Sequence, residues 1–252
     1  MEKVLYMELV PQEFRERIKT CPIAYLPLGT LEWHGEHLPL GSDGIQSQGF
    51  FIKLAEKVGG IVLPMLFMGP DRSMENENKN GYLYGMDYWT GENESGAKIR
   101  EPEQLDGSAY WLSDESFYDL IDGIFKQLSR AGFKIIVAHG HGPSTAQVAK
   151  REKEWLDKYG LNVLNCWGSD YDSEGMGIQV DHAAMNETSL VWAIRPELVQ
   201  MERLSKEPEN LPVAVSGKDP RFYASREKGE KIIELNLERM ANILIDILRK
   251  GK

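Results

Sequence analysis

The chain has 252 residues, 42% of them hydrophobic and 27% charged, the composition of a globular protein with enough apolar side chains for a full core. Its net charge of −10, without a dense basic block, argues against a nucleic-acid-binding surface. No apolar stretch approaches the roughly 18 residues of a membrane span, the first residues do not resemble a secretory signal, and the two cysteines form no disulfide framework. We therefore expect a cytoplasmic protein that binds neither membranes nor nucleic acids.

The first half of the chain contains strand and helix patterns followed by a long irregular stretch. Residues 23–29 are an apolar run that ends at glycine, which predicts a buried strand. Ser42 and Asp43 stand where a helix N-cap belongs, before a predicted helix to about residue 58. A second strand is expected at 61–65. An excursion at about 69–112 has few periodic apolar positions, and such loops are functional or disordered.

Regular patterns return at Ser113, the expected cap of a helix that ends at Gly132. Strands are predicted at 134–138 and 161–166, with one helix at 144–159 between them. Further helices are expected at about 187–194 and 225–249. The alternation predicts an α/β fold, a mainly parallel sheet with helices on both faces, in a single domain spanning residues 1–252.

All five histidines fall in three short segments. His34 and His37 follow the first predicted strand, His139 and His141 follow the strand at 134–138, and His182 precedes the helix at 187–194. Ligands of parallel α/β sheets bind beyond the carboxyl ends of the strands. The first two segments are therefore expected to meet at one edge of the sheet.

The residues around the first histidine suit a metal site. Glu32 and His34 are two positions apart, so in an extended stretch their side chains point the same way, and a Pro/Gly turn can return Asp43 to them. Carboxylate oxygens and imidazole nitrogens are suitable ligands for Zn, Mn or Fe(II). His141, with a glycine on either side, brings a second nitrogen source. The alternative interpretation is that Asp43 only caps a helix.

Three ordered motifs resemble those of the creatininase family. Residues 32–43, E-W-H-G-E-H-L-P-L-G-S-D, are similar to the signature E-x-H-G-x-H-L-P-x-x-x-D at identical spacing. Residues 140–142 resemble the core of the second motif, N-G-H-G-G-N. Residues 182–189, H-A-A-M-N-E-T-S, and R-P-E-L at 195–198 resemble the third motif, H-A-G-x-x-E-T-S…R-P-E-L. The resemblance extends from about residue 25 to residue 199.

The resemblance implies a three-layer α/β/α domain that binds two divalent metal ions per chain and assembles into a homo-oligomer, often a hexamer. Zn is the expected metal, with Mn or Fe(II) as alternatives. Carried over by position, Glu32 and His34 each ligate one ion, Asp43 bridges both, and His141 joins Glu32. Glu187 of the third motif is the expected remaining ligand, opposite His34.

Other positions concern catalysis or depart from the family pattern. His182 matches a family histidine that handles substrate or protonates the leaving group. Pro143 stands where creatininase has a glutamate, two residues after the second-motif histidine, and this weakens the case for creatinine as the substrate. His139 and Ser144 replace two asparagines, which alters the surroundings of the ligands. His139 is interpreted as a structural histidine.

Several further side chains are candidates for substrate binding. The excursion at 76–106 is longer than the corresponding family loop and is rich in aromatic residues, which can pack on the faces of a ring-shaped ligand and bond to its edges. The alternative is that these aromatics join subunits of an oligomer. The predicted substrate-binding residues are His37, Tyr82, Tyr84, Trp89 and Trp167.

The leading functional hypothesis is a metal-dependent hydrolase that opens a small polar cyclic substrate. A metal-bridging hydroxide would attack a carbonyl carbon, and His182 would donate a proton to the leaving group. The bond cleaved would be the C–N bond of a cyclic amide or formamide, or a C–C bond of an oxidised carbocycle such as an inositol-derived diketone.

Two other classes of protein are considered. A mononuclear Fe(II) oxygenase would use His34, Asp43 and His141, but the two further acidic ligands call for a second ion. The other is a non-catalytic, metal-dependent small-molecule-binding protein that keeps the fold.

Overall fold

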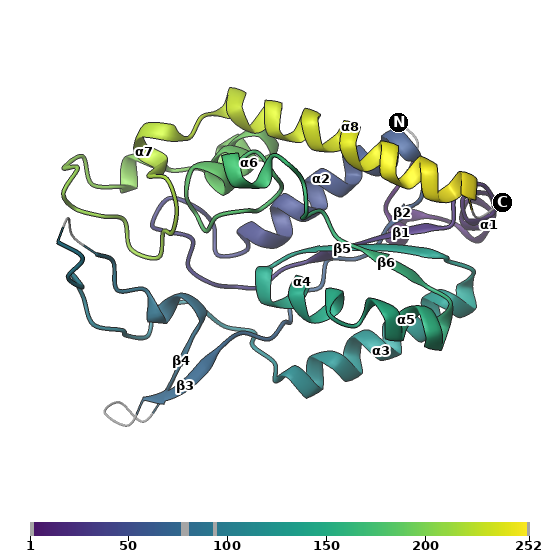
Figure 1. Cartoon of the computed structure of the whole chain (residues 1–252), viewed down its shortest axis with the longest axis horizontal. Helices are drawn as coiled ribbons and strands as arrows, with labels where there is room; N and C mark the ends of the chain where they lie inside the picture. The colour runs from purple at the N-terminus through teal and green to yellow at the C-terminus, as the bar shows by residue number, and fades with distance from the viewer. Residues whose placement is uncertain (1–2, 77–80, 93–94, 251–252) are drawn as a thin grey trace.

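The computed structural model of the chain describes residues 3–76, 81–92 and 95–250. Within these residues, a parallel sheet has the strand order β2-β1-β5-β6 (Figure 1). Its strands are β1 (Ile23–Leu28), β2 (Ile61–Val62), β5 (Ile135–Gly140) and β6 (Asn162–Leu164). Every residue of β1 and β5 is buried, as expected for central parallel strands covered on both faces. The predicted parallel sheet is confirmed.

Helices cover both faces of this sheet (Figure 1). One layer contains α2 (Ser42–Val58), α6 (Met185–Ile194) and α8 (Arg226–Lys250), and the other contains α3 (Asp114–Ala131), α4 (Gly142–Ala149) and α5 (Glu152–Tyr159). Alternate strand residues face opposite layers, so Tyr25 and Val137 pack with the first layer and Ala24 and Ile136 with the second. The helix α1 (Pro11–Thr20) adds Phe14 to the second core. The three-layer α/β/α fold is confirmed.

A separate antiparallel hairpin lies in the predicted irregular excursion. It consists of β3 (Ser73–Asn76) and β4 (Gly81–Tyr84), followed by the 3₁₀ helix η2 (Gly85–Tyr88), and it projects away from the sheet (Figure 1). Isolated bridges join Leu31 to Ala109 and Gly69 to Trp111, which tie the ends of the excursion to the main body. The excursion is therefore more regular than predicted.

The remaining elements are short, and one prediction about a helix is wrong. They are η1 (Tyr6–Glu8), η3 (Asp172–Glu174), η4 (Pro196–Leu198), η5 (Met201–Arg203) and α7 (Pro220–Tyr223). The single helix predicted at 144–159 is broken into α4 and α5. At the break, the carbonyl oxygen of Val148 accepts from the amide of Arg151 at 3.3 Å, in a tight turn, and from Trp155 Nε1 at 3.1 Å. No helix among the described residues is long and apolar enough to cross a membrane.

Candidate metal centre

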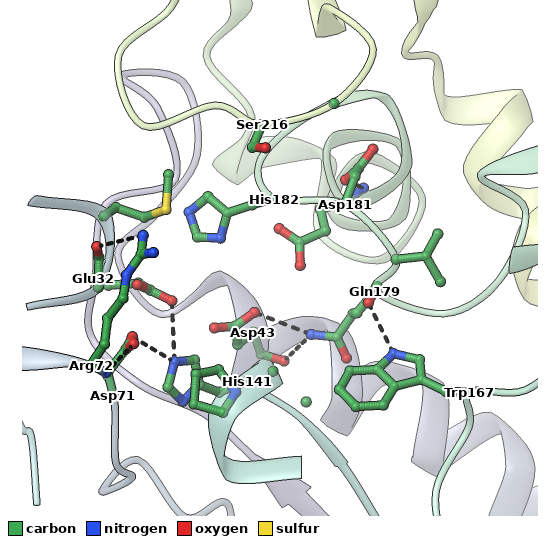
Figure 2. A pocket seen from close by; sticks show the side chains of 18 residues that line it. Glu32, Asp43, Asp71, Arg72, His141, Trp167, Gln179, Asp181, His182 and Ser216 are labelled. Atoms are coloured by element: carbon green, nitrogen blue, oxygen red, sulfur yellow. Dashed lines mark hydrogen bonds and ion pairs between the residues drawn. The ribbon is translucent and has the colours of Figure 1, made fainter. Parts of the chain in front are cut away.

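A cavity of about 900 Å³ opens where β1 and β5 end, and 18 residues line it (Figure 2). The register of the sheet places Leu28, the last residue of β1, opposite Gly140, the last residue of β5. The segments that follow these strands therefore begin side by side. This is the edge at which the sequence predicted a ligand site.

The segment after β1 delivers three of the predicted ligands. Glu32 and His34 lie in the loop between β1 and α2, and both are buried. Asp43 is the second residue of α2, whose N-cap is Gly41 and has no side-chain cap. The alternative interpretation of Asp43 as a helix cap is therefore wrong, and its buried carboxylate is free to serve the cavity.

His141 reaches the same place because the backbone of Gly140 packs against β1. Gly140 has φ +146°, and a Cβ atom there would lie 1.7 Å from the carbonyl oxygen of Leu28, so no other residue fits. The amide of His141 donates to that oxygen at 3.0 Å. Its Nδ1 lies 3.0 Å from Ser144 Oγ, which turns Nε2 toward the carboxylates.

Two groups of possible metal ligands share Asp43. The first contains Glu32, Asp43 and His141, and the second contains His34, Asp43 and Glu187. His141 Nε2 lies 3.5 Å from Glu32 Oε1. His34 Nε2 lies 3.4 Å from Asp43 Oδ1 and 3.5 Å from Glu187 Oε2. The structure thus brings together all five side chains that the sequence analysis assigned to metal, in the pairs that the resemblance implied.

The spacing and the chemistry of these groups fit divalent cations. Ligand atoms about 2.1 Å from an ion in tetrahedral geometry lie roughly 3.4 Å apart, whereas a good hydrogen bond between imidazolium and carboxylate is roughly 2.7–2.9 Å long. The observed separations of 3.4 and 3.5 Å match the first value. In addition, Asp43 Oδ2 is buried and has no hydrogen-bond partner among the described residues.

The ionisable groups of the site strongly perturb one another. Burial raises the pKa of Glu32 to about 8 and holds the pKa of Glu187 well above its ordinary value. Burial alone would lower the pKa of His34, but the Asp43 carboxylate raises it to about 10. Conversely, His34 outweighs the effect of burial on Asp43 and lowers its pKa. Without ions, protons therefore balance the charge of these carboxylates.

His182 lies above the ligand cluster and lines the cavity (Figure 2). Its ring stacks on that of His34 with 4.3 Å between centroids, and its Nε2 lies 2.8 Å from the carbonyl oxygen of Trp33. A carbonyl oxygen only accepts hydrogen bonds, so Nε2 carries the proton and Nδ1 remains as the acceptor of the neutral ring. A ring nitrogen of His182 also comes within 4.8 Å of ligand atoms of Glu32 and His34.

The sequence analysis missed five polar residues of the cavity, namely Ser216 and the four described next. Asp71 Oδ2 lies 3.3 Å from His141 Nε2, and Arg72 follows it along the wall. Gln179 donates to Asp43. Asp181 accepts hydrogen bonds from two backbone amides at the start of α6, and burial raises its pKa to about 6. Only Asp181, the neighbour of a motif histidine, had a detectable signal in the sequence.

The predicted substrate-binding residues occupy different places. Trp167 lines the cavity, and the other four do not, namely His37, Tyr82, Tyr84 and Trp89. The buried ring of His37 donates from Nε2 to Thr188 Oγ1 at 2.8 Å, because that hydroxyl donates to a backbone carbonyl. Trp89 donates to the carbonyl oxygen of Val215 at 2.8 Å.

The two tyrosines belong to the hairpin. Tyr82 is 55% exposed, and Tyr84 stacks on Trp111 with 5.7 Å between ring centroids. Tyr84 and Trp111 line a smaller cavity that shares Asp71 with the main one. Within one chain, these aromatics therefore lie beside the metal centre rather than over it.

Comparison with known proteins agrees with this site. A family model described as creatininase, creatinine amidohydrolase, matches residues 7–81 and 101–244. The chain belongs to the creatininase family. Residues 82–100, which contain most of β4 and all of η2, lie outside the match.

Known members of the creatininase family align over nearly the whole chain. The creatinine amidohydrolase of Pseudomonas putida is 26% identical over 278 positions, which cover 97% of each protein. A solved tryptophan-to-phenylalanine mutant of creatininase has a TM-score of 0.71 at 21% identity and covers 97% of this chain and 98% of its own. A putative creatinine amidohydrolase from Bacteroides fragilis has a TM-score of 0.58 at 18% identity, covering 97% and 96%.

Solved creatininases of the same fold include a form with Mn and a mutant of Zn–Zn type. Family membership identifies this chain as a metal-dependent hydrolase and disfavours the Fe(II) oxygenase and the non-catalytic binding protein. The number of ions, the homo-oligomer and the cytoplasmic location remain predictions.

Proposed function

We propose that this chain is an amidohydrolase that opens a small polar cyclic amide at its C–N bond, with two divalent ions held by the five ligands described above. The observation that carries the proposal is the position of Asp43, which belongs to both ligand groups on the floor of the cavity. Bound ions in such a pair polarise a carbonyl oxygen and make water nucleophilic near neutral pH. The similarity to creatinine amidohydrolase supports C–N rather than C–C cleavage.

In this proposal the protein's own ligands divide into two sets. Glu32 and His141 hold one ion, and His34 and Glu187 hold the other. Ser144 fixes the ring of His141 through Nδ1. Because all five ligands are buried, packing holds their orientation before the reaction begins.

His182 is the proposed proton carrier. Its Nδ1 accepts a proton from the attacking water and then passes it to the nitrogen that leaves as the ring opens, so that water is added across the C–N bond. The hydrogen bond from Nε2 to the Trp33 carbonyl keeps the ring in this tautomer and stabilises the positive charge during the transfer.

The substrate is proposed as a cyclic amide in general, not creatinine in particular. Pro143 lines the cavity where the family resemblance would place a glutamate, so the polar lining differs at that position. Asp71 and Arg72 add polar groups near Pro143, since all three residues also line a smaller pocket. A polar lining of this kind favours a ring with additional polar substituents.

A substrate panel with metal-reconstituted protein tests the proposal. The metal-free protein is loaded with Zn or Mn, and hydrolysis of creatinine, other cyclic amides, formamides and oxidised inositols is measured. We expect two ions per chain and turnover of at least one cyclic amide, with Asp43→Asn as the inactive control. Turnover confined to oxidised inositols would contradict C–N cleavage, and a single ion per chain would contradict the paired site.

A further inference from the structure

Gln179 is tied to the shared ligand Asp43 across 136 positions of sequence. Its Nε2 lies 3.2 Å from the backbone oxygen of Asp43 and 3.3 Å from Oδ1 (Figure 2). Both partners are acceptors, so the amide group of Gln179 must face them, and its orientation is fixed by chemistry. Gln179 is 5% exposed and forms part of the cavity lining.

The hydrogen bond from Gln179 falls on the carboxylate that the two ligand groups share. Rotation of an aspartate carboxylate about its last bond is soft, so a donor on Oδ1 sets the plane of the whole group. With Oδ1 engaged by Gln179 and His34, Oδ2 is left buried without a partner among the described residues. We propose that Gln179 is a positioning residue that orients Asp43 for two ions before either binds.

The backbone of Gln179 is held in an unusual conformation. Its φ is +53°, in the left-handed region that residues other than glycine rarely adopt. The indole Nε1 of Trp167 donates to the carbonyl oxygen of Gln179 at 3.2 Å (Figure 2). Strained backbone of this kind persists where the surroundings hold it and is frequent at functional sites.

His139 fixes the segment that carries Gln179. Its Nε2 donates to the carbonyl oxygen of Ile178 at 3.0 Å, and its Nδ1 accepts from the amide of Cys166 at 3.4 Å. The ring is fully buried and packs edge-to-face with Trp167, with 5.2 Å between centroids. His139 therefore joins both ends of residues 166–178 and has no nitrogen left for a metal ion.

These contacts form one connected network, in which His139 and Trp167 hold Gln179 and Gln179 holds Asp43. They give His139 and Trp167 an indirect role, because both act on the site by placing Gln179. Second-sphere hydrogen bonds of this kind typically change metal affinity by about 10–100-fold. The inference concerns metal binding only and therefore stands or falls separately from the identity of the substrate.

The test is metal affinity of Gln179→Met, which keeps the length of the side chain and removes the donor. Gln46→Met is the matched control, because Gln46 is 1% exposed, lies one turn beyond Asp43 in α2, and has no hydrogen-bond partner for its amide among the described residues. Zn and Mn dissociation constants are measured by chelator competition on metal-free proteins whose circular dichroism matches that of the parent.

We expect Gln179→Met to lower the affinity for both ions by about 10–100-fold. Gln46→Met should change neither affinity by more than about 3-fold. Unchanged affinity in Gln179→Met, or equal losses in the two variants, would overturn the proposal. His139→Leu and His139→Gln supply a second test. The leucine variant should weaken metal binding, and the glutamine, whose Nε2 stands in for the Nε2 that donates to Ile178, should restore most of it. Unaltered metal binding in His139→Leu would show that His139 does not help to position Gln179.

Discussion

The cavity has a floor, formed by the loops after β1 and β5 and the start of α6, and an outer wall, formed by residues 71–72 and 85–86. The floor supplies the five proposed ligands and His182, all within the three family motifs. The outer wall supplies Asp71, Arg72, Gly85 and Met86, and residues 82–100 lie outside the family match. The floor thus carries the residues of the family motifs, and part of the wall lies outside the family match.

The two regions touch at Gly85. A Cβ atom at this glycine would lie 2.6 Å from Asp71 Oδ2 and 2.9 Å from Glu32 Oε2, so its backbone packs against a carboxylate from each region. Arg72 donates to the carbonyl oxygen of Gly85 at 3.3 Å, and its guanidinium lies 4.8 Å from the ring centre of Tyr88. The wall is therefore positioned to shape the substrate side of the cavity without replacing the floor ligands.

The largest expected effect is on metal binding, which should respond more to a substitution of Asp43 on the floor than to one of Asp71 on the wall. Asp43→Asn removes the charge that both ligand groups share, so metal binding should weaken by more than about 100-fold and activity should be lost. Asp71→Asn should weaken metal binding less, because Asp71 lies at hydrogen-bond distance from one proposed ligand, His141, and its other carboxylate oxygen accepts from the backbone amide of Arg72. Metal content after dialysis and kcat for both variants measure the difference. Equal losses would mean that the wall supplies a ligand as important as the shared one.

The next effect concerns catalysis on the floor. His182→Ala should retain near-normal metal content but lose about 10²–10⁴-fold in kcat, most severely for substrates with poor leaving groups. Elemental analysis and steady-state kinetics check the two parts. Loss of metal would make His182 a ligand, which its distance to Glu32 and His34 permits, and unchanged turnover would make it structural.

Metal removal should make the stability of the floor depend on pH. The pKa of Glu32 is raised to about 8 from 4.5 and that of His34 to about 10 from 6.5, so between pH 7.5 and 9 the metal-free folded state binds more protons than the unfolded state. Its stability therefore falls as pH rises, by about 2–3 kcal/mol over this range.

The range from pH 7.5 to 9 lies above the range in which the other buried histidines change the stability of the protein in the opposite direction. Burial lowers the pKa of His37 and His139 to about 4 and that of His182 to about 3, below the unfolded value of 6.5. Their effect on the stability of the protein is therefore complete once the pH exceeds 6.5. Urea unfolding at pH 7.5 and 9.0, with and without Zn, measures the effect. If the metal-loaded protein showed the same pH dependence, metal binding would not displace the protons of Glu32 and His34, and their assignment as ligands would be contradicted.

The smallest effect is expected from the wall. Arg72→Gln should raise KM by roughly 3–10-fold for a substrate with a polar substituent and leave kcat and metal content nearly unchanged, because one hydrogen-bonding group is lost from the cavity. Arg100→Gln is the control, since Arg100 pairs with Glu103 and does not line the cavity. A fall in kcat with constant KM would place Arg72 in the chemistry of the floor.

Local patterns in the sequence were sufficient for most elements and for the floor of the site. The apolar run at 23–28 and the capped helix after Ser113 have the predicted bounds within a residue or two, since Ser113 Oγ accepts from the amide of Ser116 at 3.1 Å. The helix α1 was outside the predicted elements, because its buried side consists of little more than Phe14 and Ile18. The break between α4 and α5 is a tight turn from Val148 to Arg151 and has no Gly or Pro to mark it.

The sequence by itself determined the fold class, because the alternation of apolar residues is a local property of the chain. The five proposed ligands followed from the resemblance to the family motifs, and the local spacing of Glu32, His34 and Asp43 supports three of them. Only the tertiary structure decided which groups surround those ligands. Asp71 meets His141 across 70 positions, and Gln179 meets Asp43 across 136. No spacing rule connects such distant residues, since the packing of loops at the sheet edge brings them together. The same packing places Tyr82 and Trp89 outside the lining of the cavity, although the aromatic composition of their segment had suggested that they line it.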